Sequence, residues 1–299
     1  MFHHFHNKFH KKTQGSISGS QLQKIIEHLR SRYNLINSHE FCQKVINKKI
    51  KKKDVCLTFD DCLKSQFDIA FPILKKMNIS AFFFIYSSVF DPKPNNLEIF
   101  RDFRNSKFSN IDKFYECFFD LLKKKYFQDY LLFEKKFKKN YLIKYKFYTL
   151  SDRKFRFCRD KILSHNIYEK IMFLLMKQKK YNLRNAKIKL FMSKKNIKSL
   201  IKNQNSIGLH SDSHPINIYK LSFKRQYKDY KKNYDFLIKN FKIKTTSMSH
   251  PFGRYNKNTL KVLKKLGIKI GFLSSPAKSN KSNLEIGRID HNLLIKKIK

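Results

Sequence analysis

The sequence predicts an α/β protein whose parallel strands carry helices on their outer faces and which contains one large helical insertion. Residues 55–59 and 80–86 are short apolar runs typical of buried strands, and the segment between them has apolar residues at helical spacing. A strand, a helix and a strand within about 35 residues imply a parallel sheet. The alternation resumes after residue 205, whereas residues 91–205 are rich in Phe, Tyr, Leu and Lys at helical spacing.

The first 53 residues are expected to lead into this α/β core. Residues 1–5 fit a first strand, although a His-rich tail fits as well. From Ser20 an amphipathic helix is indicated by apolar residues that recur every three or four positions: Leu22, Ile25, Ile26 and Leu29. The next helix, over residues 67–77, contains Pro72, which predicts a kink or a late start.

Strands and helices alternate regularly in the last third of the chain. The expected strands are residues 206–209, 245–249, 268–273 and, as a last strand, 286–289. The expected helices are residues 223–241 and 257–266, the second ending at Gly267. The chain therefore divides into a lead (1–53), an α/β core (54–90 and 206–299) and a helical insertion (91–205).

The composition is strongly basic. The 299 residues contain 66 Lys and Arg against 22 Asp and Glu, for a net charge of +44. This charge suits a phosphate-bearing or other anionic partner, such as an anionic membrane or a phosphate-linked sugar. Compositional drift also explains it, because Lys is spread along the whole chain while Gly is 7 and Trp is 0. Nucleic acid is not the expected partner, because no reader motif accompanies the charge.

The insertion allows two interpretations. Its Phe and Tyr side chains could stack on bases between Lys contacts, or they could form the core of a helical bundle. Their helical periodicity favours the bundle.

Cysteine usage and hydropathy indicate a cytoplasmic protein, with peripheral membrane contact left open. The five Cys form no CxxC pair, which suggests neither a disulfide framework nor a zinc ribbon. The N-terminus lacks the apolar stretch of a secretory signal, and the longest strongly apolar run, residues 81–86, is too short to span a bilayer.

Two strand ends carry the residues that point to chemistry. The first strand runs into Asp60 and Asp61, and the strand at 206–209 runs into His210-Ser-Asp-Ser-His214. One carboxylate and two imidazoles are the ligand set of a catalytic zinc. Asp61, His210 and His214 therefore predict a divalent metal site, which would leave Asp60 beside a metal-bound water as a possible base.

Three motifs resemble those of the polysaccharide deacetylase family (NodB homology, carbohydrate esterase 4): TFDD at 58–61, HSDSH at 210–214 and HPFGRY at 250–255. The resemblance covers about residues 54–90 and 206–291. It implies a distorted (β/α) barrel of about seven strands that hydrolyses an N-acetyl or O-acetyl group on a sugar. It further implies Asp60 as the general base, zinc as the usual metal, and the backbone N–H of Phe252 as an oxyanion donor.

The chain departs from the family pattern at three places. Cys62 stands where the family has Gly, and is strained there if the position needs a positive φ. Ser249 stands where the family has the Arg that orients the base. The fourth motif, which contains Trp, is absent because the chain has no Trp.

The resemblance leaves two histidines as candidates for the general acid. His291 is the best-placed candidate and His250 the second, since the family uses a His late in the chain. Arg288 is expected to pair with the base or to bind substrate. His3 and His4 could reach the site from a first strand.

The sequence therefore predicts a metal-dependent deacetylase acting on an acetylated saccharide or its precursor. The alternative is a catalytically impaired deacetylase fold that holds a polyanionic saccharide or another anionic partner. The missing Arg and the missing fourth motif favour the alternative, and the intact Asp-Asp-His-His set favours the enzyme. The sequence leaves the oligomeric state open.

Overall fold

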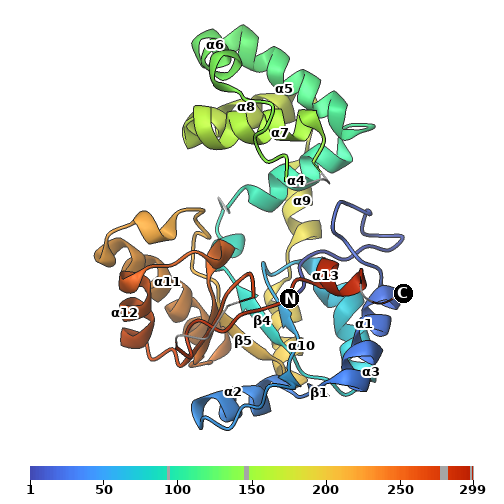
Figure 1. The fold of residues 1–299 in the computed structure, drawn as a ribbon, viewed down its shortest axis with the longest axis vertical. Helices are drawn as coiled ribbons and strands as arrows, with labels where there is room; N and C mark the ends of the chain where they lie inside the picture. Colours follow the sequence, from blue (N-terminus) through green and yellow to red (C-terminus); the bar gives the residue numbers. More distant parts are fainter. Residues whose placement is uncertain (93–94, 145–147, 277–281, 297, 299) are drawn as a thin grey trace. The chain divides into compact units, whose positions relative to one another are not determined.

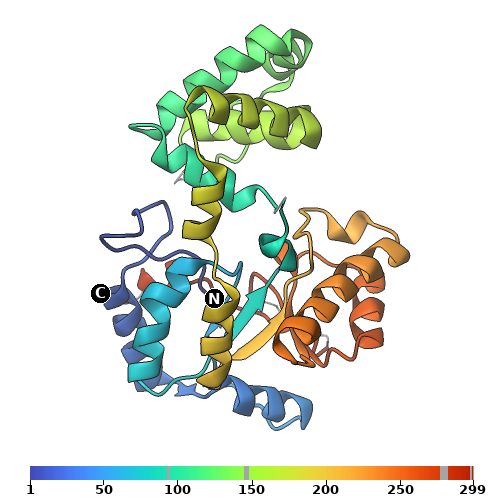
Figure 2. The same cartoon turned by 180° about the vertical axis from the view of Figure 1, so that it is seen from behind.

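The computed structural model describes residues 1–92, 95–144, 148–276, 282–296 and 298 (Figures 1 and 2). The chain forms two compact units: Met1–Asn95 with Lys187–Lys299, here the barrel unit, and Asn96–Ala186, here the helical unit. The insertion over residues 91–205 stays a prediction.

A five-stranded parallel sheet lies at the centre of the barrel unit. Its strands follow one another in the order β3 (Thr58–Phe59), β4 (Phe82–Ile85), β5 (Ser206–Leu209), β6 (Ser247–Ser249) and β7 (Ile270–Phe272). A second parallel pair joins β1 (Asn34–Leu35) to β2 (Asp54–Val55). The single strand expected over 55–59 is thus two short strands in two sheets. The α/β class with parallel strands is confirmed.

Two extended segments close the sheet toward a barrel. The first lies beside β3 through a parallel bridge between Phe2 and Phe59, and the other lies beside β7 through a parallel bridge between Phe272 and Ile286. The two segments meet, since the Met1 amine donates to the Ile289 carbonyl at 2.9 Å and the His291 N–H donates to the Met1 carbonyl at 3.1 Å. The described residues therefore form a curled parallel sheet of five strands that matches the deacetylase fold, extended by the two bridged segments at Phe2 and Ile286. The expected count of about seven strands is not matched exactly.

The helices of the barrel unit lie outside the sheet. In Figure 1, α11 and α12 lie on one side of the strands and α1 and α3 on the other. Their bounds are α1 (Gly19–Arg32), α2 (Ser38–Ile46), α3 (Phe71–Lys76), α10 (Lys194–Lys202), α11 (Phe223–Phe241), α12 (Lys257–Lys265) and α13 (His291–Ile295). Short turns of helix complete the unit: η1 (Gln66–Ala70), η2 (Ser87–Phe90), η4 (Ile218–Lys220) and η5 (Pro251–Gly253).

Local sequence explains how these helices begin. Ser18 caps α1 by accepting from the Gln21 N–H, and the Gln21 side chain accepts from the Ser18 N–H in return. Helical residues begin at Lys64, and Pro72 follows directly on the π-turn η1. The distortion expected at this proline is therefore a π-turn within the helix and not a late start.

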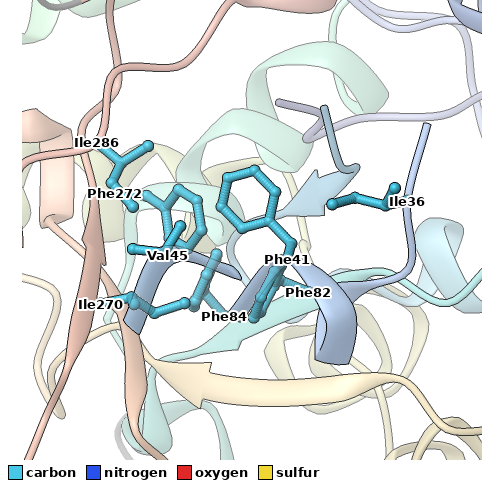
Figure 3. Close-up of a cluster of buried hydrophobic side chains, with 8 residues drawn as sticks. All are labelled: Ile36, Phe41, Val45, Phe82, Phe84, Ile270, Phe272 and Ile286. Carbon is cyan, nitrogen blue, oxygen red and sulfur yellow. The ribbon is translucent and has the colours of Figure 1, made fainter. Parts of the chain in front are cut away.

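Aromatic side chains pack α2 against the sheet. Figure 3 shows Phe41 and Val45 of α2 pointing toward Phe82, Phe84 and Phe272, all buried. Ring centroids of Phe82 and Phe272 lie 5.2 Å apart. Each fully buried aromatic ring stabilises the fold by roughly 1.5–3 kcal/mol relative to its exposed state.

A glycine allows the close approach of β4 and β5. A Cβ at Gly208 would lie 2.5 Å from ring carbons of Phe84, which is below any ordinary contact distance. A side chain at this position would therefore collide with the Phe84 ring and with Ser247 Oγ.

The helical unit is a bundle with an aromatic core. Its helices are α4 (Leu97–Ser106), α5 (Ile111–Lys125), α6 (Phe127–Lys136), α7 (Leu150–Phe157), η3 (Cys158–Ile162), α8 (His165–Gln178) and α9 (Leu183–Leu190), which continues into the barrel unit. Phe103, Phe114, Phe118 and Phe155 are at most 1% exposed. These rings form the bundle core, as the helical periodicity indicates. Among the described residues, no helix has the length and apolar character needed to cross a bilayer.

Candidate metal and base site

The candidate site lies at the carboxyl ends of β3 and β5, which flank β4 in the sheet. Asp60 and Asp61 follow β3 directly, and His210 follows β5. Both loops adopt left-handed backbone conformations, with φ of 79° at Asp61, 57° at Cys62 and 48° at His214. Left-handed conformations at residues other than Gly are uncommon and cluster at functional sites. Cys62 thus occupies the conformation for which the family uses Gly.

Asp61, His210 and His214 form a tight triangle of ligand atoms. The two Nε2 atoms lie 3.1 Å apart, and Asp61 Oδ1 lies 3.3 Å from that of His210 and 3.4 Å from that of His214. Ligand atoms of a tetrahedral zinc with bonds of about 2.0–2.1 Å are separated by about 3.3 Å. The triangle therefore fits the metal that the donor set implies.

A buried oxygen supports the same fit. Asp61 Oδ1 has no hydrogen-bond partner among the described residues, although the residue is only 6% exposed. A buried carboxylate oxygen without a donor is costly unless a cation satisfies it.

Contacts behind the ligands fix their orientation. His210 Nδ1 lies 2.8 Å from the Ser249 carbonyl and donates to it, so the neutral ring presents the lone pair of Nε2 to the triangle. The His210 N–H donates to the Asn233 Oδ1 at 3.0 Å. Burial lowers the pKa of His210, but the carboxylates of Asp61 and Asp60 outweigh burial and raise it above the ordinary value.

A second network holds the loop between the two histidines. Asp212 accepts hydrogen bonds from Ser87 Oγ at 2.6 Å and from Lys232 Nζ at 2.8 Å. Asp229 accepts from the Asp212 N–H at 2.8 Å and from Ser213 Oγ at 2.5 Å. The sequence analysis did not predict that Lys232, Asp229 and Asn233 support this loop. The only indication in the sequence is that each is a polar residue on the side of a long helix that faces the sheet.

Asp60 is held by Arg288 and Ser249. Arg288 donates from its two terminal nitrogens to the two carboxylate oxygens, at 2.8 and 2.6 Å, and both side chains are 4% exposed. Ser249 Oγ donates to Asp60 Oδ2 at 3.1 Å and accepts from Arg288 at 2.8 Å. Burial raises the pKa of Asp60, but the charge and hydrogen bonds of Arg288 hold it well below its ordinary value.

His3 reaches the site from the N-terminal segment. Its Nε2 lies 3.9 Å from Asp60 Oδ2 and 3.9 Å from Asp61 Oδ2, and its side chain is 26% exposed. Burial lowers its pKa despite the nearby carboxylates. His4 stacks beside it, with ring centroids 6.1 Å apart.

The two late histidines lie in other surroundings. The nitrogens of His291 lie 3.2 Å from the Met1 carbonyl and 2.9 Å from the Gly15 carbonyl, and its ring stacks on Phe2. His250 donates from Nε2 to the Leu284 carbonyl at 2.8 Å, and burial lowers its pKa to about 4. Their roles in catalysis stay predictions that this geometry does not favour.

Phe252 borders the triangle. Its ring centroid lies 4.9 Å from that of His214, its side chain is 38% exposed, and its φ is 56°. The left-handed conformation turns the backbone within η5, beside the candidate ligand His214.

Comparison with known proteins identifies the family. The family model for polysaccharide deacetylase matches residues 47–103 and 161–271, which is more than half of the chain. The chain belongs to the polysaccharide deacetylase family. The family assignment confirms the resemblance of the three motifs and makes this family member a sugar deacetylase. No curated protein is a significant match.

Solved structures share the fold of this deacetylase. The chain is similar to the Streptococcus pyogenes deacetylase PplD in complex with acetate, at 18% identity and a TM-score of 0.55, over 100% of this chain and 96% of that one. It is also similar to IcaB from Ammonifex degensii, at 15% identity and a TM-score of 0.55, over 96% of this chain and 88% of that one. A de-N-acetylase from Aggregatibacter actinomycetemcomitans gives 15% identity and a TM-score of 0.56, over 97% of this chain and 92% of that one.

Proposed function

We propose that this deacetylase removes N-acetyl groups from a saccharide with a divalent metal, zinc by preference, held by Asp61, His210 and His214. The observation that supports the proposal is the triangle of ligand atoms beside an ionised Asp60. When bound, zinc would lower the pKa of a water and polarise the acetyl carbonyl. The remaining chemistry belongs to side chains of the chain itself.

Asp60 acts as the general base. Arg288 keeps it ionised at neutral pH, and the bidentate contact fixes the carboxylate plane. A carboxylate with a lowered pKa is a weak base, so it removes a proton only from a water that is already acidified. Asp60 and the metal site are therefore needed together.

His3 is the proton donor that the geometry favours. It lies 3.9 Å from both carboxylates, and its side chain is partly exposed to solvent. Water attacks the acetyl carbon and gives its proton to Asp60. Because burial lowers the pKa of His3, its ring starts neutral, and the proton passes from Asp60 to this ring and then to the amine nitrogen as the carbon–nitrogen bond breaks. The amine and acetic acid leave, and Asp60 is again ionised. His291 remains the alternative donor, although its ring nitrogens face backbone carbonyls.

The oxyanion formed by this attack needs donors besides the metal. The N–H of Phe252 is the candidate, because η5 places this residue against His214. Its exposed ring would form one wall of the sugar site.

The substrate is an acetylated saccharide. A phosphate-linked precursor, free or at an anionic membrane, would suit the net charge of +44. The impaired-fold alternative loses one of its two supports, because Arg288 supplies Asp60 with the guanidinium partner that Ser249 cannot provide.

Bound metal and acetate release test the proposal directly. The purified chain is analysed for zinc and incubated with chitooligosaccharides and peptidoglycan fragments. Asp60→Asn should retain zinc and lose turnover, and His210→Ala should lose both. Asp54→Asn is the matched control, since this buried carboxylate of β2 accepts hydrogen bonds from the Lys51 N–H and from the Asn34 side chain of β1. A wild-type chain that holds zinc but releases no acetate from any of these sugars would refute the enzyme assignment.

His3 and His291 are separated by a second pair of variants. His3→Ala should lower kcat by about 10²–10⁴-fold, the usual contribution of a positioned acid, while zinc remains bound. His291→Ala should change stability more than kcat. The opposite result would return the role of proton donor to His291.

A further inference from the structure

The N-terminal segment, residues 1–5, needs an anchor to place His3. Phe2 donates its N–H to the Thr58 carbonyl at 2.9 Å, and its carbonyl accepts from the Asp60 N–H at 3.2 Å. These two bonds fix the backbone before His3 but leave its own carbonyl to another donor. The position of the imidazole depends on that donor.

Gln66 is this donor. Its Nε2 donates to the His3 carbonyl at 2.9 Å and to the Asp60 carbonyl at 2.5 Å, and the residue is 0% exposed. Both N–H bonds of the amide are thereby used, and two carbonyl acceptors fix which end of the amide faces them. One side chain thus ties the backbone of His3 to the backbone of Asp60.

The amide is retained at a cost. Gln66 Oε1 is buried without a hydrogen-bond partner among the described residues. A buried polar atom without a partner destabilises a fold, and such atoms persist where they serve another purpose. Gln66 also begins η1, a turn of π-helix, and such turns are frequent at functional sites.

Neighbours of Gln66 hold the same part of the chain. Ser65 Oγ accepts from the Phe5 N–H at 3.4 Å, and Asp68 Oδ2 lies 2.8 Å from His10 Nε2. Residues in and next to η1 therefore contact the N-terminal region at several points. Of these contacts, the one made by Gln66 involves His3 and Asp60 themselves.

We propose that Gln66 is a positioning residue that fixes His3 against Asp60 and Asp61 by bonding the His3 and Asp60 carbonyls together. The proposal rests on the proposed function, since it gives His3 a role in proton transfer. Gln66 itself touches neither metal nor substrate. Its loss should misplace His3 while Asp61, His210 and His214 keep their triangle.

Gln66→Met tests the proposal, because Met has similar length and no donor. With penta-N-acetylchitopentaose as substrate, kcat should fall about 10- to 100-fold, as expected when a reacting group moves by about 1 Å, with KM and zinc content nearly unchanged. Gln226→Met is the matched control. Gln226 lies in α11, is 0% exposed and donates to the Leu221 carbonyl just before that helix at 2.8 Å. It should lose thermal stability but keep kcat.

A double-mutant cycle separates positioning from a general structural effect. If Gln66 acts through His3, then Gln66→Met should add no further loss of kcat in a His3→Ala background. Additive losses, or a Gln66→Met kcat equal to that of the wild type, would overturn the proposal.

A readout without turnover distinguishes this proposal from the proposed function. In protein labelled with ¹⁵N-histidine, the His3 signal, assigned by its loss in His3→Ala, should shift in Gln66→Met and stay in Gln226→Met. If the wild type releases no acetate, a shifted His3 signal still supports the positioning contact, and an unchanged signal refutes it.

Discussion

The pair formed by Arg288 and Asp60 gives the most demanding prediction. Arg288→Met keeps much of the side-chain volume and removes the guanidinium, which leaves a buried carboxylate that is 4% exposed. Removing one partner of a buried ion pair costs about 3–5 kcal/mol, because the remaining charge is uncompensated. The free energy of unfolding should fall by about that amount at pH 7.

The loss should depend on pH in a defined direction. Arg288 lowers the folded pKa of Asp60 below its ordinary value of 3.8, so the pair stabilises the wild type above that pH and less as pH falls below it. Without Arg288, burial raises the pKa of Asp60 instead. The variant then takes up a proton on folding, and its deficit relative to the wild type should shrink as pH falls from 7 toward 5.

Urea unfolding at pH 7 and pH 5 measures both effects, and the acid limb of kcat/KM gives an independent reading. That limb should move to higher pH in Arg288→Met, because Asp60 must be ionised to accept a proton. Arg254→Met is the control: this exposed Arg bonds the Ile216 carbonyl and Asn217, and its loss should cost less than about 1 kcal/mol. Equal losses in the two variants, with an unmoved acid limb, would contradict the reasoning.

The other predictions concern the candidate metal ligands and the backbone near them. His210→Ala should weaken zinc binding by more than about 100-fold in calorimetry. In the wild type, zinc affinity should decrease as the pH is lowered, and the decrease should begin above pH 6.5, because protons compete with zinc for a His210 whose pKa is raised. A chelator should lower the Tm of wild type but not of His210→Ala, since zinc binds only the folded chain. Cys62→Gly should change the free energy of unfolding by less than about 1 kcal/mol, because relief of the left-handed conformation offsets the lost thiol burial, and zinc content should stay. Gly208→Ala should destabilise the fold by about 1–3 kcal/mol in urea unfolding, because its Cβ would lie 2.5 Å from the Phe84 ring. An unchanged midpoint would contradict this and show that the ring moves aside without cost.

Residues at the ends of strands were predictable from the sequence. The apolar run at 206–209 is β5 itself, and a parallel sheet must bring the residues after its strands to one edge. That rule alone places His210 near Asp61. The geometry of the triangle could not be predicted in the same way. It depends on left-handed backbone conformations at Asp61 and His214, and neither residue type indicates such a conformation.

The sequence alone does not determine the contacts of His3 and Arg288 with the site. Residues 1–5 join the barrel through isolated bridges, which are too short to show a period of two in the sequence. Arg288 lies 228 positions after Asp60, and no local pattern links the two. His291 fits the family pattern by its position in the sequence. In the structure its ring is buried against Phe2 and its nitrogens face two backbone carbonyls, which favours a structural role over proton transfer.

The separation between Asp60 and Arg288 has a consequence for protein synthesis. Asp60 leaves the ribosome 228 residues before the guanidinium that holds it. Until then the nascent chain has a carboxylate that can be buried only in protonated form or left in water. Until that point the N-terminal segment also lacks the Ile289 carbonyl, which accepts from the Met1 amine in the folded chain. A nascent chain arrested before Arg288 should therefore stay sensitive to protease around β3, and the barrel should close only after residues 288 and 289 have been translated.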